Sequence, residues 1–397
     1  MMNANRTVYD VLIVGAGPGG STLARLLALQ GQRVALVDKA RFPRPKTCGD
    51  GLTPRAVRTL RHLGLEHRVA AGGHQVRRAR LYAGPDLEVT APFTALPQEL
   101  PPYGWVVPRE RLDQRLLEAA LEAGAHFFPN EPIARIDRQA PHSVAWGRQG
   151  RPWRARWVVI ATGASTGLLR RSGFLSQAPH DIAAARGYWE SVADLDDALE
   201  FFFLPEIPHG YAWVFPVGDG VANIGLGLYH RPGEPAPPVR RWLKALTTQH
   251  PALAPRLRSA RLREPVRAYP LRSDFPHGPL GGPGWLTIGE AAGLVNPVSG
   301  EGIDLALESA ILAAEALRAP DQDALARYRR LARRRFALAM HGLRLLRPLV
   351  MRPRVLRRLL RKAQSHPPLL RRIMGITLGV TSPMSVLAPS TWWWLLA

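Results

Sequence analysis

The stretch that decides the fold is residues 9–38, which read YDVLIV-GAGPGG-STLARLLALQGQ-RVALV-D. The first and fourth blocks are short and rich in β-branched apolar residues, which predicts two buried strands. The third block carries leucines at helical spacing, and Gly31 near its end is a helix stop signal. It therefore predicts a helix over 21–30. The stretch therefore predicts a strand, a glycine turn, a helix and a second strand that ends at Asp38.

The glycine turn has the G-x-G-x-x-G spacing of dinucleotide-binding folds. Gly15 permits the tight turn, Gly17 lets the backbone approach a pyrophosphate, and Gly20 lets the helix and strand pack closely. The start of the helix offers unpaired N–H groups to phosphates, and Asp38 can accept hydrogen bonds from ribose hydroxyls. The contacts predicted for this unit are Gly15, Ala16, Gly17, Pro18, Gly20, Asp38 and Lys39.

Later segments favour FAD over NAD as the dinucleotide. Residues 157–165 (WVVIATGAS) predict a strand that ends in a turn at Gly163, and residues 285–293 (WLTIGEAAG) predict another that enters a turn carrying Glu290. We expect Glu290 to reach a ribityl hydroxyl. The chain thus approaches its cofactor through glycine turns that lie about 270 residues apart, which suits the long FAD molecule better than NAD.

A further glycine-rich segment, residues 296–303 (NPVSGEGI), directly precedes a helix predicted to run to about residue 317. The start of such a helix presents backbone N–H groups to an isoalloxazine ring or to phosphates. Gly300, Gly302 and Ile303 are therefore further predicted cofactor contacts.

These segments resemble the FAD-dependent monooxygenase superfamily, and within it the geranylgeranyl reductase family, over roughly residues 9–320. The resemblance implies a mixed α/β fold with a discontinuous Rossmann-type FAD-binding domain and an antiparallel-sheet substrate domain. In that family the acid of the third glycine motif is usually Asp. This chain has Glu290 there, one methylene longer, and we expect it to keep the role.

Two more stretches support this resemblance. Residues 46–51 (KTCGDG) are similar to the family's Cys-Gly turn, which implies that Cys48, Gly49 and Gly51 lie beside the flavin. A lone cysteine is otherwise most often a small buried apolar residue. Arg109 opens a segment similar to the family's Arg-x-x-Phe-Asp pattern, which implies a contact with FAD phosphate or ribose. A solvated surface arginine is the alternative.

The most discriminating stretch is residues 210–216 (GYAWVFP), which resembles the family's Tyr-x-Trp-x-Phe-Pro segment. Tyr211, Trp213 and Phe215 alternate, so they point to one face of a strand. An aromatic face opposite a flavin would hold an apolar polyprenyl chain, whereas the alternative is an ordinary aromatic sheet core. We predict these three residues as substrate contacts. Tyr211 and Cys48 are nearby candidates for catalysis, but no acid stands out, and we expect no metal.

The predicted division of the chain has three parts. The FAD-binding domain is expected over 1–70, 100–167 and 280–325, and the substrate-binding sheet domain over 71–99 and 168–279. Residues 326–397 are expected to form a basic helical tail. It has a helix over about 325–346 that is kinked or ended at Pro348 and Pro353, and a second helical piece over 355–364.

The charge of the chain is concentrated in this tail. The net charge is +22, and the 16 Arg and Lys residues from Arg327 to Arg372 face no Asp or Glu after Asp323. Arginine and leucine interleave as in helices that lie on anionic lipid, and the three tryptophans at 392–394 suit an interfacial anchor. Nothing resembles a base-reading motif, so we expect no nucleic-acid partner. The alternative is a solvated helix enriched in arginine by a GC-rich genome.

The flavin motifs predict an FAD-dependent oxidoreductase, and the family resemblance implies a reductase of C=C bonds in the polyprenyl chain of a lipid, quinone or diphosphate. The electrons are expected from an external donor, either NAD(P)H or a ferredoxin-like protein. A single cysteine excludes an intrachain disulfide and suits a reducing compartment, so we expect a cytoplasmic protein peripheral on the inner face of the cell membrane. Two alternatives stay open: an NAD(P)H- and FAD-dependent monooxygenase acting on an aromatic or quinone substrate, and a flavoprotein that only passes electrons.

Overall fold

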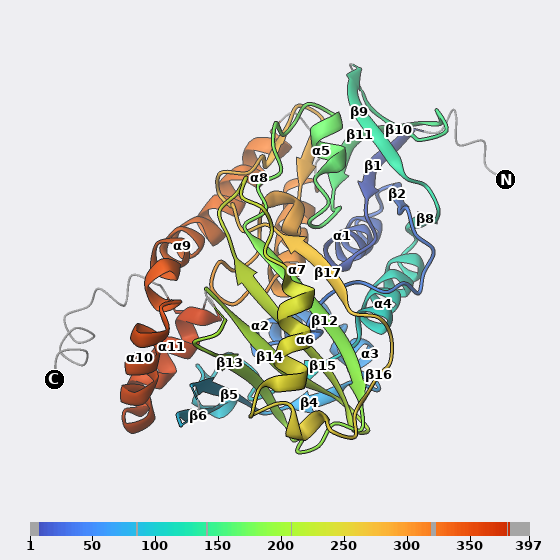
Figure 1. Ribbon diagram of the computed structural model, residues 1–397. Coiled ribbons are helices and arrows are strands. Elements are labelled where there is room, and N and C mark those ends of the chain that lie inside the picture. Colours follow the sequence, from blue (N-terminus) through green and yellow to red (C-terminus); the bar gives the residue numbers. More distant parts are fainter. Residues whose placement is uncertain are drawn as a thin grey trace.

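The structure is a computed structural model that describes residues 8–84, 86–139, 142–207, 209–318, 323–378 and 380–381. It has a mixed α/β fold, as predicted, with three sheets and a run of helices along one side (Figure 1). The tryptophans at 392–394 lie outside the described residues. Within the described ranges, none of the helices has the length and apolarity that a bilayer crossing requires.

The first sheet is built around the predicted N-terminal unit. Its central strand β1 pairs in parallel with β2 on one side and β11 on the other. In order across the sheet, the strands are β18 (Gly281–Gly282), β19 (Trp285–Thr287), β11 (Pro152–Ile160), β1 (Val8–Val14), β2 (Val34–Val37) and β8 (His126–Phe128), with β9 (Ile133–Gln139) and β10 (His142–Gly147) extending from β11. The helices packed near this sheet are α1 (Pro18–Leu29), α4 (Arg109–Glu122) and α7 (Ile303–Ala316).

The glycine turn brings β1 and α1 into very close contact. Gly15 has a φ of +109°, a backbone conformation that L side chains rarely adopt. A Cβ on Gly20 would lie 1.8 Å from the carbonyl oxygen of Gly15, so no larger residue fits there without moving the backbone. This contact fixes the angle at which α1 leaves the sheet.

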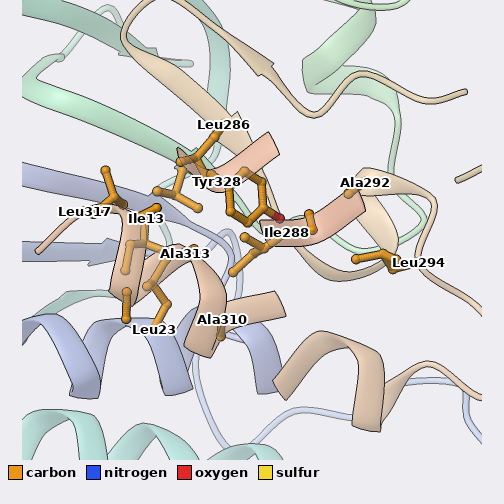
Figure 2. Close-up of a cluster of buried hydrophobic side chains, with 14 of the residues drawn as sticks. Ile13, Leu23, Leu286, Ile288, Ala292, Leu294, Ala310, Ala313, Leu317 and Tyr328 are labelled. Carbon is orange, nitrogen blue, oxygen red and sulfur yellow. The ribbon is translucent and has the colours of Figure 1, made fainter. Parts of the chain in front are cut away.

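Apolar side chains from distant parts of the chain form the core beneath the turn. Figure 2 shows Leu23 of α1, Ala310 of α7 and Tyr328 of the C-terminal region. They are gathered near Ile13 of β1 and Leu286 of β19. Tyr328 is fully buried and donates a hydrogen bond of 2.8 Å to the carbonyl of Thr287. The C-terminal helices are therefore packed into the core of the FAD-type fold.

The second sheet is largely antiparallel and carries the aromatic segment. In order its strands are β16 (Arg261–Leu262), β12 (Ile182–Glu190), β15 (Val221–Tyr229), β14 (Gly210–Gly218), β13 (Ala198–Phe203), β5 (Arg78–Ala83) and β6 (Glu88–Pro92), with β17 (Arg267–Leu271) also paired to β12. Ala212 and Val214 of β14 pack into one apolar cluster, whereas Trp213 and Phe215 belong to another. The alternation predicted for this strand is therefore correct.

A small third sheet and several short helices complete the part before the C-terminal region. The sheet consists of β3 (Gly51–Leu52), β7 (Gly104–Val106) and β4 (His74–Val76). The helices are α2 (Pro54–His62), α3 (Glu66–Ala70), α5 (Gly167–Arg171) and α6 (Val239–Gln249), with single 3₁₀ turns at Phe93–Ala95, Pro255–Leu257 and Gly289–Ala292. The third sheet joins β3 and β7, from the predicted FAD-binding ranges, to β4, from the predicted substrate-binding range. The domain division stays a prediction.

The C-terminal region is helical and follows one flank of the molecule (Figure 1). It contains α8 (Ala324–Ala332), a π-helical turn (Arg333–Ala337), α9 (Leu338–Val350), α10 (Pro353–Ser365) and α11 (Pro367–Thr377). The helix α9 continues past Pro348 and ends at Val350, so the chain breaks between the two prolines named in the prediction. Pro353 instead occupies the first turn of α10, where its missing N–H is not needed.

The glycine contact gives a test of the fold. We expect Gly20→Ala to lower the free energy of unfolding by about 3 kcal/mol, because the added methyl group overlaps the Gly15 carbonyl. Gly31→Ala is the control: its φ is +80° but nothing lies within 4 Å of the added Cβ, so only backbone strain of about 1 kcal/mol is expected. Urea unfolding compares the two variants, and equal losses would contradict this account.

Candidate active site

One cavity of about 1250 Å³ connects the glycine turn, the aromatic sheet and the C-terminal helices. Cavities that bind one small molecule usually measure about 300–1000 Å³. The volume therefore leaves room for a second ligand beside a dinucleotide.

Most of the predicted site residues line this cavity. Two of the predicted contacts, Ala16 and Gly20, are instead buried behind the turn and hold it in shape. The predicted residues on the cavity wall are Gly15, Gly17, Pro18, Asp38, Lys39, Cys48, Gly49, Gly51, Arg109, Gly163, Tyr211, Trp213, Phe215, Glu290, Gly300, Gly302 and Ile303.

At the first end of the cavity the backbone is prepared for phosphates. Helix α1 starts at Pro18 after Gly17, and no side chain caps it, so its first N–H groups have no partner within the helix. The Nη2 atoms of Arg44 and Arg109 lie 3.8 and 4.0 Å from the position that a Cβ on Gly17 would take. Uncapped N–H groups and two guanidinium groups around a glycine fit the pyrophosphate of FAD.

The two arginines are held by one buried carboxylate. Arg109 donates two hydrogen bonds to Asp113, of 2.7 and 2.8 Å, and Arg44 lies 3.3 Å from the same carboxylate. Asp113 has no exposed surface, so it fixes both guanidinium groups without facing solvent itself. The sequence predicted Arg109 but missed Arg44, whose only signal was its place in the basic loop RFPRPK.

Asp38 stands at the end of β2, where the sequence places it. One of its carboxylate oxygens accepts the N–H of Ala16 at 2.8 Å, and the other accepts the N–H of Ala40 at 2.9 Å. The carboxylate thus ties the glycine turn to the second strand. Each oxygen keeps a further lone pair, so the predicted ribose contact stays possible.

Further along the cavity, Glu290 faces Lys46. Burial raises the pKa of Glu290, and the nearby Lys46 ammonium acts in the opposite direction. Burial lowers the pKa of Lys46 to about 8, and its ammonium lies 3.4 Å from the centre of the Tyr269 ring. Glu290 Oε1 also accepts the N–H of Arg272 at 3.3 Å, so the longer side chain is anchored at the cavity wall.

A buried carboxylate lies behind the Cys-Gly turn, and the sequence analysis assigned it no role. Asp50 is fully buried and accepts hydrogen bonds from Tyr188, from Asn223 Nδ2 at 2.8 Å and from the N–H of Arg109 at 3.3 Å. Burial raises its pKa to about 6, although these donors favour the charged form. Asn223 also donates to the Cys48 carbonyl at 2.8 Å, so this network fixes the turn.

The aromatic wall lies beside the turns at Gly49 and Gly300. Phe201 and Phe203 of β13 join the rings of β14, and Trp213 donates a hydrogen bond of 3.0 Å to Asn223. Phe215 carbons lie 3.0 and 3.3 Å from the position of a Cβ on Gly49. The aromatic face therefore borders the Cys-Gly turn directly.

The far end of the cavity is formed by α9, α10 and α11. Its wall there is apolar, with basic groups from α10 and α11 among the leucines. The lining residues of α10 are Val355, Leu356, Arg358, Leu359, Leu360, Arg361 and Lys362. An apolar passage with cationic groups at one end suits a long hydrocarbon chain with a polar head.

The comparisons with known proteins agree with this arrangement. Residues 8–200 match the family described as FAD binding domain, and residues 181–258 match the one described as geranylgeranyl reductase catalytic domain. The chain is 33% identical to menaquinone reductase of Mycobacterium tuberculosis, over 79% of this chain and 77% of that protein. This chain belongs to the geranylgeranyl reductase family. It is an FAD-dependent oxidoreductase of the prenyl reductase type, which confirms the predicted family and enzyme class.

The chain is also similar to an archaeal lipid reductase and to several solved structures. The chain is 30% identical to digeranylgeranylglycerophospholipid reductase of Thermoplasma acidophilum, over 77% of both chains. Among solved structures, a geranylgeranyl bacteriochlorophyll reductase-like protein of Thermoplasma acidophilum superposes with a TM-score of 0.78 at 24% identity, covering 97% of each chain. A flavin-dependent brominase superposes with a TM-score of 0.76 at 20% identity, covering 98% of this chain and 99% of the other. These superpositions confirm the fold.

The two arginines at the glycine turn give a test of the cofactor site. We expect Arg44→Gln to weaken FAD binding roughly tenfold, because one positive charge near the pyrophosphate is lost. Arg109 should stay in place, because its hydrogen bonds to Asp113 remain. Arg41→Gln is the control, since Arg41 is exposed in the same loop and does not line the cavity. Fluorescence titration of FAD-free protein measures both affinities. The same affinity in both variants would argue against this placement of the pyrophosphate.

Proposed function

We propose that this protein reduces isolated C=C bonds in the polyprenyl chain of a membrane quinone or glycerolipid. The observation that carries the proposal is the continuous cavity, which joins a dinucleotide-type turn to an aromatic wall and then to an apolar passage between the C-terminal helices. The relatives named menaquinone reductase and digeranylgeranylglycerophospholipid reductase support this substrate class.

The residues of the site would perform separate tasks. Gly17, Arg44 and Arg109 would hold the phosphates of FAD, and Glu290 would hold its ribityl chain. When bound and reduced, FAD supplies a hydride equivalent. The rings of Tyr211 and its neighbours on β14 would exclude water and hold the alkene at a reactive distance, which is the main contribution expected of the protein.

Each reduction of a double bond would oxidise the bound flavin, so a donor outside this protein must reduce the flavin again before the next turnover. We propose NAD(P)H or a ferredoxin-like protein as the donor. Anaerobic mixing of the FAD-loaded protein with each donor, followed by the bleaching of flavin absorbance, separates these two possibilities.

The C-terminal helices would place the cavity against an anionic membrane. Three exposed leucines on α9, Leu338, Leu345 and Leu349, follow one another at spacings of seven and four residues and so share one face. On α10, the exposed arginines at 354, 358 and 361 are spaced by four and three residues, so they also share one face of their helix. An exposed apolar face on α9 and an exposed cationic face on the following helix α10 suit the headgroup region of a bilayer, from which a prenyl chain could enter.

The reaction is tested by comparing lipids and quinones from cells with and without the protein. We expect two added hydrogen atoms per reduced double bond in a prenyl chain, detected by mass spectrometry and dependent on the protein. Gain of an oxygen atom instead would favour the monooxygenase. Unchanged lipids and quinones, from cells whose protein still binds and passes electrons through FAD, would favour a simple electron carrier.

The membrane surface is tested with vesicles that contain anionic phospholipid. We expect the triple variant Arg354→Gln, Arg358→Gln and Arg361→Gln to lose about 3 kcal/mol of binding, roughly 100-fold, because each basic residue near the surface contributes about 1 kcal/mol. Sedimentation with the vesicles measures the affinity, and added salt should weaken the wild type more than the variant.

The matched control removes three exposed arginines elsewhere: Arg170→Gln, Arg241→Gln and Arg258→Gln. This triple variant has the same change in net charge, so it should bind the vesicles nearly as well as the wild type. Equal losses in both triple variants would show that net charge, and not the surface of α10, attracts the lipid.

A further inference from the structure

A cluster of carboxyl groups lies at the start of α7, beside the glycine turn at residue 300. Arg55 donates to Glu308 through Nε at 2.7 Å and Nη2 at 2.9 Å, and Arg335 approaches the same carboxylate at 2.7 Å. Asp304 lies farther from Arg55, at 3.5 Å. The closest guanidinium contacts in this cluster thus go to Glu308, so that carboxylate is the charged one.

Glu301 and Asp304 receive much less compensation. Asp304 is buried, and its Oδ1 has no hydrogen-bond partner in the structure. Across the described part of the chain, Glu301 forms no ion pair. Its carboxyl accepts hydrogen bonds from the hydroxyl groups of Ser299, at 3.4 Å, and Thr53, while the charge of Arg55 acts on it from beyond ion-pair distance. Asp304 is buried and Glu301 is partly buried, and both depend on Arg55, whose closest contacts go to Glu308. Charging both carboxyl groups is therefore unfavourable, and we expect the pair to hold a proton.

Glu301 is positioned to deliver that proton into the cavity. It lines the cavity between Gly300 and Gly302. Tyr211, the first ring of the aromatic wall, donates a hydrogen bond to the carbonyl of Ser299, and its hydroxyl lies 3.4 Å from the position of a Cβ on Gly300. The carboxyl is therefore next to the wall where the prenyl chain is proposed to lie.

We propose that Glu301 donates the proton that completes alkene reduction. This proposal rests on the proposed function. One alkene carbon receives a hydride from the reduced flavin, the other receives the carboxyl proton, and two C–H bonds replace the π bond. The flavin is oxidised by two electrons and the alkene is reduced by two. The Glu301 carboxylate then recovers a proton from water, and the external donor reduces the flavin again.

Other acids near the cavity are less suited to this role. The Tyr211 hydroxyl is committed to the Ser299 carbonyl, and burial raises its pKa well above the usual value. Asp50 is fully buried, and its oxygens already accept three hydrogen bonds that stabilise the carboxylate. Glu290 faces the ammonium of Lys46 at the other part of the cavity.

The protonation of Glu301 has a defined direction with pH. Burial, and next the charge of Asp304, raise its pKa to about 8, while Arg55, Thr53 and Ser299 act in the opposite direction. The acid form is therefore present below pH 8 and is lost as pH rises through that value. Product formation should follow the same course.

The variant Glu301→Gln tests the proposal, because an amide is neutral and of similar shape but cannot donate this proton. We expect unchanged FAD content and unchanged flavin reduction by the donor. The rate of alkene reduction should fall at least about 100-fold, and the loss of activity above pH 8 should disappear. Glu301→Asp should retain a slower reaction with a dependence on pH.

The control is Glu315→Gln, which removes an exposed carboxylate near the other end of the same helix and should leave the rate unchanged. Infrared spectra give a readout independent of turnover. The wild type should show a carboxylic acid carbonyl band that disappears as pH rises through about 8, and Glu301→Gln should lack that change. The band of Asp50 should disappear near pH 6 in both proteins. Absence of the band that disappears near pH 8 in the wild type would overturn the proposal.

The outcomes separate the two proposals. If the wild type forms saturated product and Glu301→Gln forms it at a similar rate, the role of Glu301 is wrong and the proposed function stands. If the wild type carries FAD but forms no saturated product from any prenylated quinone or glycerolipid, the proposed function fails and the role of Glu301 fails with it.

Discussion

The rest of the structure depends on the close contact between the first strand and the first helix. Gly20 packs against the carbonyl of Gly15, and the side chain of Asp38 holds the turn through the N–H of Ala16. Because the helix begins there without a side-chain cap, the same contact that fixes the fold also leaves backbone N–H groups directed at the cavity. Stability and cofactor binding therefore share one short stretch of backbone.

Part of the positive charge of the C-terminal region is paired within the folded protein. The sequence suggested an anionic partner for the whole region, but some of its arginines pair with acids elsewhere in the fold. Arg347 lies 2.8 Å from Asp181, and Arg357 pairs with Asp86, which lies beside the second sheet. Internal pairing thus accounts for part of the excess, and the exposed arginines of α10 are the part left for a membrane.

The glycine turns and the alternating aromatic strand were predictable because local spacing determines them. The period of two along β14 fixes which rings share a face, whatever lies on the other side. The groups that the sequence missed depend on tertiary contacts. Arg44 becomes a candidate phosphate-binding residue only because Asp113, on helix α4 far along the chain, holds its guanidinium group. Glu301 becomes an unusual acid only in the folded chain, where burial and the charge of Asp304 raise its pKa, and no spacing in the sequence reports those surroundings. The two prolines located the break between α9 and α10 only to within a few residues, because a proline near the end of a helix need not stop it.

The central claim is that reduced FAD and an unsaturated prenyl chain meet in one dry cavity. The most direct test is a single anaerobic turnover: the FAD-loaded protein is reduced, freed of excess reductant and mixed with a menaquinone that carries an unsaturated side chain. The claim predicts that the flavin is reoxidised while an equal amount of quinone gains two hydrogen atoms in its side chain. Reoxidation that reduces only the quinone ring and leaves every side-chain double bond intact would contradict it.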